Sequence, residues 1–248
     1  MLRPLPLPAP HPTMLHLPIP ARRLGLVLAL TTALASPAFA QARNHAGDDI
    51  LAPAAEAEPL VVLARSLQVG DIIFTRIGSY PFRKVAEATG TWTNHVGIVL
   101  DVSGKEPLVG ESRFPLSGTT TLSRFVARSA GSRVAVMRLP DPLTPAQQVA
   151  LVAAATQRAR VFYDTGFDVR SHRQFCSRYV REVLREATGA EVGRVETFHQ
   201  LLADAPQADV GFWRLWYFGS IPWRRETVTP ASVLRTPGLH TVFDGVAT

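Results

Sequence analysis

Cysteine is almost absent from this chain, because Cys176 is the only one among 248 residues. A lone cysteine cannot form a disulfide within the chain, so no such bridge holds the fold together. The sequence also lacks any cluster of histidine, cysteine and aspartate residues at metal-ligand spacing. We therefore expect neither a metal nor an organic cofactor.

Long apolar runs are missing too, apart from one at residues 24–35, which is too short to span a bilayer comfortably. Two arginines precede this run and Ala38-Phe39-Ala40 follows it, in the order typical of a secretory signal peptide. We expect residues 1–40 to be a signal peptide cleaved after Ala40. The mature protein would then be periplasmic or secreted, with no transmembrane segment.

The remaining chain divides into a linker and one domain. Residues 41–59 are polar at first and then small, acidic and proline-rich, a composition typical of a flexible linker. Residues 60–248 have a length that suits a single folded domain and contain no internal repeat. Met14 is an alternative start that would give the signal peptide a more usual length.

Charge is modest and shows no clustering of one sign. The formal net charge is +6, and removing residues 1–40 takes away three arginines and no acid, which leaves +3. Because no stripe of lysine and arginine occurs, nucleic acid is not an expected partner, whereas an anionic envelope surface is compatible with this charge. With 46% hydrophobic and 19% charged residues, the composition is that of a globular protein.

The spacing of apolar residues predicts an α+β fold in which a small antiparallel sheet or barrel packs against helices. Strands are predicted at 72–77, 93–101, 107–112 and 133–139, and the turn at 103–105 joins the second and third as a hairpin. Helices are predicted at 80–89, 122–127, 145–158 and 176–188, with a further helix start at Thr229-Pro230.

Cys176 stands at the start of one of these helices. Apolar residues recur at helical spacing from Phe175 to Ala187, and Gly189 follows where the helix would stop. The unpaired N–H groups and the positive dipole end of a helix start favour thiolate over thiol. Cys176 is therefore a candidate nucleophile, and a buried structural thiol is the alternative.

A nucleophilic thiol needs an imidazole to take its proton and a third polar group to orient that imidazole. His95 begins a rigid strand, and Glu111 falls opposite this strand if the hairpin forms. His172 competes with His95, being four residues before Cys176, but it would lie at the surface with nothing to orient it. The sequence predicts a catalytic set of Cys176, His95 and Glu111.

Aromatic residues crowd the C-terminal part of the chain. They indicate core or lid packing, or else an apolar wall for an acyl chain. We favour the core interpretation and therefore place a peptide or small amide substrate ahead of a lipid. Trp92 and Tyr163, close in sequence to His95 and to the cysteine helix, are candidates for substrate binding. The cluster consists of Phe212, Trp213, Trp216, Tyr217, Phe218 and Trp223.

Five short motifs follow one another along the chain. They are Leu67-x-x-Gly70-Asp71-Ile72-Ile73-Phe74, Asn94-His95-Val96-Gly97-Ile98-Val99, Gly110-Glu111-Ser112, Tyr163-Asp164-x-x-Phe167 and Phe175-Cys176-Ser177. Together they resemble the YiiX-like cysteine hydrolases, which are circularly permuted relatives of the NlpC-type, papain-like peptidases. The resemblance covers roughly residues 67–234, and the histidine strand precedes the cysteine helix as in permuted members.

This resemblance implies a permuted papain-like fold with Cys176 as nucleophile, His95 as base and Glu111 as the residue that orients the base. Two positions depart from the family pattern. Arg178 replaces the acidic residue often found two positions after the cysteine, and Phe175 replaces the tyrosine that commonly precedes it. Both changes affect the expected pocket rather than the triad.

We thus expect an exported cysteine hydrolase of the peptidase or amidase type, which cleaves an amide or ester through a thiol acyl-enzyme. Its partner would be a substrate of the cell envelope. Cell-wall peptides are one substrate class, and lipids or N-acyl amides, used by a hydrolase or acyltransferase, are the alternative. A non-catalytic binding protein is the alternative from another class, but binding alone does not require a thiol, an imidazole and a carboxylate together.

Overall fold

The structure, a computed structural model, describes residues 59–247. The expected signal peptide with its cleavage after Ala40, and the expected linker up to residue 58, lie outside the described residues. Helix α1 (Pro59–Ser66) opens the described part, one residue ahead of the predicted start of the domain. Within residues 59–247, no helix combines the length and the hydrophobicity needed to cross a membrane.

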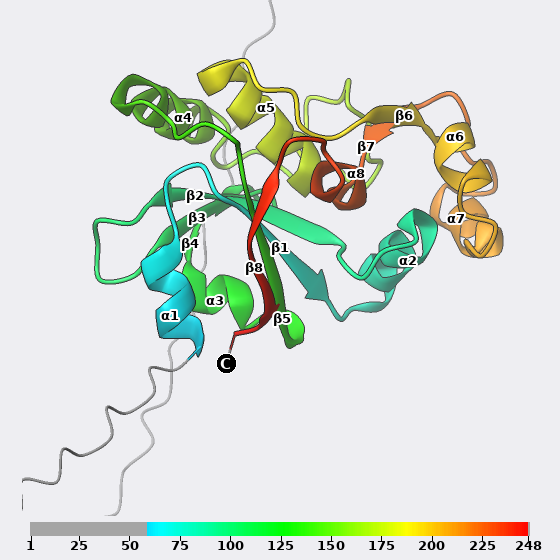
Figure 1. Cartoon of the computed structure of the whole chain (residues 1–248). Helices are drawn as coiled ribbons and strands as arrows, with labels where there is room; N and C mark the ends of the chain where they lie inside the picture. Colours follow the sequence, from blue (N-terminus) through cyan, green and yellow to red (C-terminus); the bar gives the residue numbers. More distant parts are fainter. Residues whose placement is uncertain (1–58, 248) are drawn as a thin grey trace, which may run out of the picture. The chain divides into compact units, whose positions relative to one another are not determined.

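A six-stranded sheet occupies the centre of the domain, with strand order β4-β3-β2-β1-β5-β8 (Figure 1). Every pair of neighbouring strands is antiparallel. The edge strands β4 and β8 do not pair with each other, so the sheet is open and the barrel that the sequence allowed is not formed. The strands are β1 (Ile72–Ile77), β2 (His95–Asp101), β3 (Leu108–Glu111), β4 (Gly118–Thr121), β5 (Ser129–Arg138) and β8 (His240–Val246).

Helices cover both faces of this sheet, α4 and α5 on one and α1 and α3 on the other (Figure 1). Side chains alternate between the two faces of a strand, so each strand contributes to both cores. In β1, Ile72 and Phe74 belong to the core beneath α4 and α5, whereas Ile73 belongs to the core beneath α1 and α3. These helices are α3 (Leu122–Val126), α4 (Pro145–Gln157) and α5 (Cys176–Thr188).

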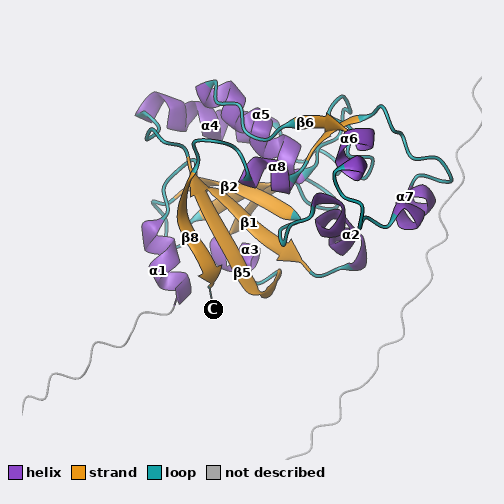
Figure 2. Ribbon diagram, turned by 45° about the vertical axis from the view of Figure 1, so that its right-hand side comes forward, coloured by secondary structure: helices purple, strands orange, loops and turns teal. Residues whose placement is uncertain are grey.

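A smaller group of elements lies beside one end of the sheet (Figure 2). Helices α2, α6 and α7 build a third core around Phe198 and Trp213. Lys84 of α2 forms an ion pair of 3.0 Å with Asp209, the residue that caps α7. The elements here are α2 (Tyr80–Thr89), β6 (Val195–Thr197), α6 (Phe198–Ala203), α7 (Val210–Trp216), β7 (Glu226–Val228) and α8 (Pro230–Leu234), and β6 pairs with β7.

Local signals decide where the predicted helices begin and end. The Thr144 hydroxyl accepts a hydrogen bond from the Gln147 N–H, and the Gln147 side chain accepts one from the Thr144 N–H. This capping box starts α4 as predicted. Gly90 and Gly189 end α2 and α5 in the left-handed conformation, with φ of 58° and 77°. The predicted bounds of α2 and α5 are confirmed, and α4 starts as predicted and ends one residue earlier, at Gln157.

Candidate active site

Cys176 is the first residue of α5, and its side chain is buried. The preceding N-cap residue, Phe175, has an extended backbone and makes no side-chain cap hydrogen bond. Because the first N–H groups of a helix lack partners within the helix, they remain free to donate to an anion. The neighbouring His95 and the backbone N–H groups of Val96 and Ser177 lower the pKa of Cys176 and so favour its thiolate form.

His95 begins strand β2 and contacts Glu111 at the end of β3. Nε2 of His95 lies 2.6 Å from Oε2 of Glu111, and both side chains are buried. The strand register explains this contact, because Ile98 pairs with Gly110 and Glu111 therefore lies opposite Gly97, two residues from His95. Such diagonal neighbours on one face of an antiparallel pair are within reach of long side chains.

Gly97 leaves room for this arrangement. A Cβ atom at position 97 would come within 2.7 Å of Val109 Cγ1 and 2.9 Å of the Phe125 ring. The Phe125 ring, from α3, lies against the His95 imidazole with the ring centroids 5.5 Å apart. A side chain at position 97 would therefore disturb the packing that holds the imidazole in place.

Two arginines approach the other oxygen of Glu111. Arg128 donates to Oε1 at 2.6 Å, and Arg113 lies 3.4 Å from the same oxygen. Burial raises the pKa of Glu111, but the contact with His95 and the charge of Arg128 outweigh this effect and hold the pKa below its usual range. Glu111 is therefore ionised and accepts a hydrogen bond from His95 Nε2–H, which leaves Nδ1 as the nitrogen that can serve a nucleophile.

His95 and Cys176 each favour the charged form of the other. Nδ1 of His95 is buried and has no hydrogen-bond partner among residues 59–247. Burial lowers the pKa of His95, but the neighbouring side chains of Cys176 and Glu111 raise it to about 9. Burial also raises the pKa of Cys176, and His95 with the two backbone N–H groups lowers it below its ordinary value. The arrangement therefore stabilises a thiolate–imidazolium pair.

Tyr163 is the fourth polar side chain at this place. It pairs with Gln174 in an isolated β-bridge just before α5. Its hydroxyl is buried and lacks a hydrogen-bond partner among the described residues. Burial and the neighbouring Cys176 thiolate raise the pKa of Tyr163 well above its usual value, so the phenol remains a proton donor. From the sequence, Tyr163 is a candidate only for substrate binding. The sequence alone does not show that the loop containing Tyr163 packs beside Cys176.

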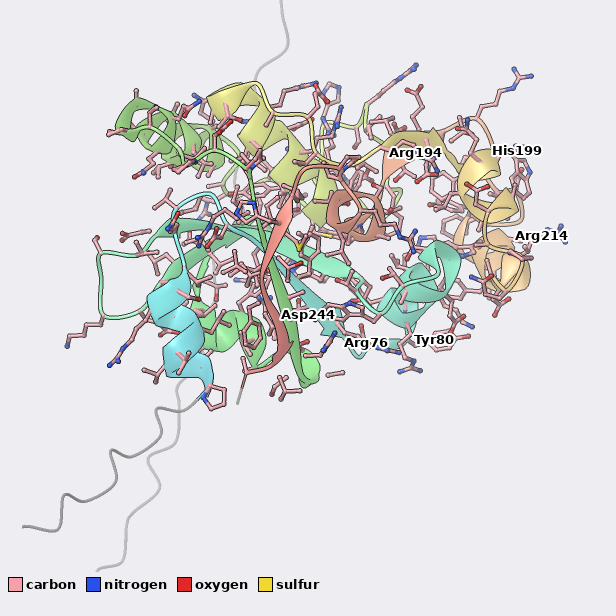
Figure 3. All side chains as sticks on the ribbon, viewed as in Figure 1. Arg76, Tyr80, Arg194, His199, Arg214 and Asp244 are labelled. Carbon is pink, nitrogen blue, oxygen red and sulfur yellow. The ribbon has the colours of Figure 1, made fainter. Side chains whose placement is uncertain are left out.

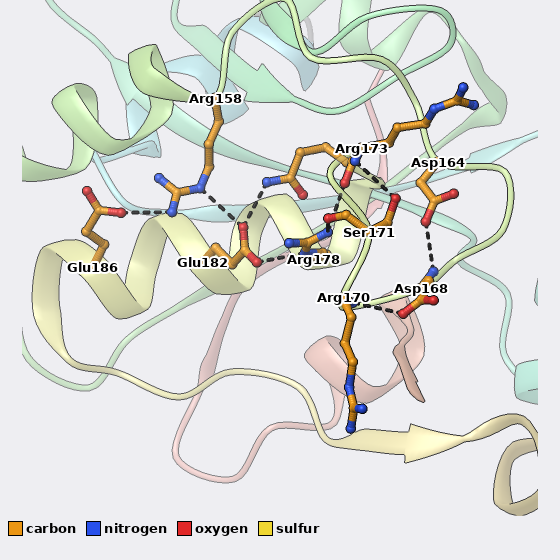
Figure 4. A network of polar contacts seen from close by, with 10 residues as sticks. Arg158, Asp164, Asp168, Arg170, Ser171, Arg173, Arg178, Glu182 and Glu186 are labelled. Carbon is orange, nitrogen blue, oxygen red and sulfur yellow. Dashed lines mark hydrogen bonds and ion pairs between the residues drawn. The ribbon is translucent and has the colours of Figure 1, made fainter. Parts of the chain in front are cut away.

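A polar network holds the loop that leads into α5 (Figure 4). Arg178 donates to the carbonyl oxygens of Ser171 at 2.6 Å and of Arg173 at 2.9 Å. It also donates to Glu182 at 2.7 Å, and Glu182 accepts a further hydrogen bond from Gln174 at 2.8 Å. The residue that departs from the family pattern, Arg178, thus fixes this loop to the helix.

His172 and Trp92, which the sequence offers as candidates, and one further histidine, His199, do not belong to this set. His172 is exposed in the loop before α5, and the helix begins only at Cys176, so His172 is not on a helix face shared with the thiol. Trp92 lines none of the cavities around Cys176, and its ring lies 5.0 Å from the guanidinium of Arg133. His199 is exposed on the outside of α6 (Figure 3).

Cys176 lines a narrow cavity of about 30 Å³, which adjoins two larger ones. A cavity of about 380 Å³ shares Tyr163 and Phe167 with it, among other residues. Another of about 460 Å³ shares Thr89 and Thr229 with it. The small cavity at the thiol thus shares lining residues with two larger cavities.

The C-terminal aromatic cluster is divided between core and cavity wall. Trp213 is buried in the third core, in agreement with the core interpretation. Phe212 and Trp216 are only half-buried and line the cavity of about 380 Å³. Phe218, at 100%, is fully exposed. Because both residues also pack against the third core, they combine the core and the cavity-wall interpretations.

Known proteins share both the sequence pattern and the fold. Residues 66–243 match the family described as permuted papain-like amidase enzyme, YaeF/YiiX, C92 family. The uncharacterized protein YiiX of Escherichia coli K12 is 30% identical over 175 residues, which are 71% of this chain and 85% of that protein. The crystal structure of YiiX from Escherichia coli O157:H7, described as a metalloprotein, gives a TM-score of 0.67 at 27% identity and covers 73% of this chain and 99% of that one. This chain therefore belongs to the YaeF/YiiX (C92) family of permuted papain-like amidases.

Proposed function

We propose that this protein is a cysteine amidase that cleaves an amide or ester bond through a thiol acyl-enzyme. The buried set of Cys176, His95 and ionised Glu111 carries the proposal, since it combines a nucleophile, a base and a group that orients the base. The Tyr163 hydroxyl and the N-terminus of α5 add hydrogen-bond donors beside the thiol.

In the first half-reaction the Cys176 thiolate attacks the substrate carbonyl carbon, and the carbonyl oxygen becomes an anion as the C–S bond forms. We assign the backbone N–H of Cys176 and the hydroxyl of Tyr163 as the donors to this anion. The His95 imidazolium then gives its proton to the leaving nitrogen. The C–N bond breaks, the amine departs, and a thioester remains on Cys176.

In the second half-reaction neutral His95 takes a proton from water while the water oxygen attacks the thioester. The C–S bond breaks and releases the carboxylic acid, and the thiolate–imidazolium pair is restored. Glu111 stays ionised throughout. Its part is to hold the ring in the tautomer and orientation that both steps need.

The ionisation of Cys176 tests this proposal. The rate of iodoacetamide alkylation should reach half its maximum at a pH well below ~8.5, the pKa of a free cysteine. In His95→Ala the half-point should move upward, because burial then acts on the thiolate without an opposing imidazolium. Mass spectrometry of the intact protein reports the rate, and Cys176 is the only cysteine that can react.

Protein unfolded in urea supplies the reference titration for this thiol. A half-point at or above the reference in the wild-type protein, unchanged in His95→Ala, would identify Cys176 as an inert structural thiol. The amidase proposal would then lose its nucleophile.

The description of Escherichia coli YiiX as a metalloprotein raises the question of a metal site in this chain. Among residues 59–247, no group of three or more His, Cys, Asp and Glu side chains is placed to hold an ion. Of the groups at the thiol, His95 Nε2 is already bonded to Glu111. The described residues do not fit a metal site of the usual three or four protein ligands, so no step above passes through one.

We propose further that the protein is exported and acts on a substrate of the cell envelope, as the order of features in residues 1–40 suggests. Protein recovered from the envelope should begin at Gln41 when its N-terminus is sequenced. Replacing Ala38 and Ala40 by leucine should block this cleavage, since the site requires small residues. Soluble cytoplasmic protein that retains Met1 or Met14 would contradict export.

A further inference from the structure

A cavity of about 500 Å³ lies between the edge strand β4 and helix α3 (Figure 1). It shares no lining residue with the cavity that holds Cys176. No aspartate or glutamate lines it. We refer to it as the arginine cavity, because its lining consists of three arginines, three threonines and one leucine: Arg113, Arg124, Arg128, Thr119, Thr120, Thr121 and Leu108.

Positive charge in the arginine cavity exceeds the negative charge available to it. Arg113 and Arg128 both pair with one oxygen of Glu111, whose other oxygen contacts His95. Arg124 forms no ion pair with the acids of residues 59–247. Glu106, the next acid in this region, accepts a hydrogen bond from the Ser123 N–H and lines a different cavity. Three guanidinium groups therefore face a single carboxylate.

Arg128 connects this cavity to the active site and is held by three contacts. It donates to Glu111 at 2.6 Å and to the carbonyl oxygen of Arg124 at 3.2 Å. Its guanidinium carbon lies 5.3 Å from the centroid of the Phe125 ring, which packs against His95. These contacts use two of the five N–H donors of a guanidinium, so three remain. The side chain is 35% exposed, so the remaining donors are accessible to a ligand.

We infer that the arginine cavity binds a phosphate group, either free or on a larger molecule, and that Arg128 transmits this binding to Glu111 and His95. Guanidinium groups match the oxygen geometry of phosphate, and the threonine hydroxyls supply further donors. A phosphate dianion carries the two negative charges by which the three arginines exceed Glu111. The site itself is independent of the proposed amidase function, whereas its effect on catalysis rests on His95 being the base.

Phosphate in the arginine cavity should stabilise the protonated form of His95. Hydrogen bonds from Arg128 to phosphate weaken its hold on Glu111 and add negative charge near the imidazole. Both effects raise the pKa of His95. The groups that face His95 are the Glu111 carboxylate from β3, the Cys176 thiolate from α5 with the neutral Tyr163 phenol beside it, and the rings of Phe82 and Phe125.

Calorimetry with inorganic phosphate tests the site. The titration is made at about pH 8, where the phosphate group is mainly a dianion, and sodium chloride keeps the ionic strength constant. Phosphate should bind once per chain, and acetate at least tenfold more weakly, because it has one charge and two oxygens. Tighter binding of glycerol 3-phosphate would indicate a phosphate carried by a larger molecule, and tighter binding of inorganic phosphate would indicate the free anion.

Arg124→Gln should weaken phosphate binding roughly tenfold or more, because it removes a charged donor. Arg124 is exposed and its side chain contacts neither Glu111 nor His95, so the fold and the titration of His95 without phosphate should persist. The matched control is Arg214→Gln, which removes the same charge from an exposed position on α7 (Figure 3). It should keep the wild-type affinity.

Nuclear magnetic resonance of protein labelled with ¹³C in its histidine rings tests the link to the active site. The His95 signal is identified by its loss in His95→Ala. Saturating phosphate should move the midpoint of its titration upward by roughly a few tenths of a pH unit. In Arg124→Gln the same phosphate concentration should have almost no effect.

This measurement needs no substrate, so its outcome is separate from that of the amidase proposal. Absence of phosphate binding, or an equal loss of affinity in Arg124→Gln and Arg214→Gln, would overturn the site. Binding without a shift of the His95 midpoint would overturn the link through Arg128. A shift of the midpoint in a protein that turns over no amide would support the site and contradict the amidase alone.

Discussion

Replacing Cys176 with alanine should lower kcat/KM for an amide substrate by at least ~10⁴-fold, because no other group can form the acyl-enzyme. Mass spectrometry of the wild-type protein quenched during turnover should show one acyl adduct, located on the peptide that contains Cys176. The alanine variant should show none. The two measurements together distinguish loss of the nucleophile from loss of substrate binding.

The fold should survive this change, and the reason is electrostatic. The thiolate is one of the two groups that raise the pKa of His95, and burial acts in the opposite direction. Without the thiolate, burial favours neutral His95, so no uncompensated imidazolium is left at the site. Urea unfolding checks that Cys176→Ala remains folded during the assay.

His172→Ala is the matched control for the histidine that competes with His95 in the sequence. Because His172 is exposed in the loop before α5, its removal should leave kcat/KM near the wild-type value. Activity retained in Cys176→Ala would show that the reaction uses another nucleophile. A large loss in His172→Ala would show that the base has been misassigned.

Much of this site could be predicted from the sequence because local rules decide it. The hairpin of β2 and β3 follows from β-branched runs around a turn, and its register alone brings Glu111 to His95. The extent of α5 follows from the apolar periodicity that begins at Phe175 and from the stop at Gly189. The family membership agrees with the order in which these motifs occur.

The parts that the sequence did not predict depend on contacts between distant segments. Arg128 reaches Glu111 from the end of α3, and Tyr163 approaches Cys176 through a single bridge to Gln174. The spacing of apolar residues along the chain carries no information about such contacts. Strand β4 was also missed, because its four residues, Gly118–Thr121, include no large apolar side chain.

The aromatic cluster shows a different limit of prediction from sequence. The spacing of Phe212, Trp213 and Trp216 cannot tell a core from a cavity wall, because both require apolar side chains. In the structure Trp213 is buried in the third core and also lines the cavity of about 380 Å³, and Phe212 and Trp216 pack beside it.

Glu111→Gln should lower kcat by ~10²- to 10⁴-fold while leaving the thiol in place. The amide is nearly the same size as the carboxylate but cannot stabilise an imidazolium by charge. It can also donate a hydrogen bond to His95, which favours the wrong tautomer of the ring. KM should change much less than kcat, because Glu111 lines none of the three cavities described around Cys176.

The dependence of kcat/KM on pH gives this variant its most specific readout. In the wild-type protein the rate should rise as the Cys176 thiolate forms and fall as His95 loses its proton, at a pH of about 9. Glu111 raises the pKa of His95, so its removal should move the alkaline limb to lower pH. Because the imidazolium then opposes burial of the thiolate less, the acidic limb should move to higher pH. The pH range in which Glu111→Gln is active should therefore be narrower than that of the wild-type protein, at both its acidic and its alkaline end.

Asp71→Asn is the matched control for this change. Asp71 is also a buried carboxylate paired with an arginine, since Arg138 donates to both of its oxygens at 2.7 Å, but it lies at the start of β1 and lines none of the three cavities. Its replacement should lower the free energy of unfolding, because a partly buried arginine loses its partner, and should leave both pH limbs in place. If both variants move the limbs alike, or if Glu111→Gln moves neither, then Glu111 acts only on stability and does not tune His95.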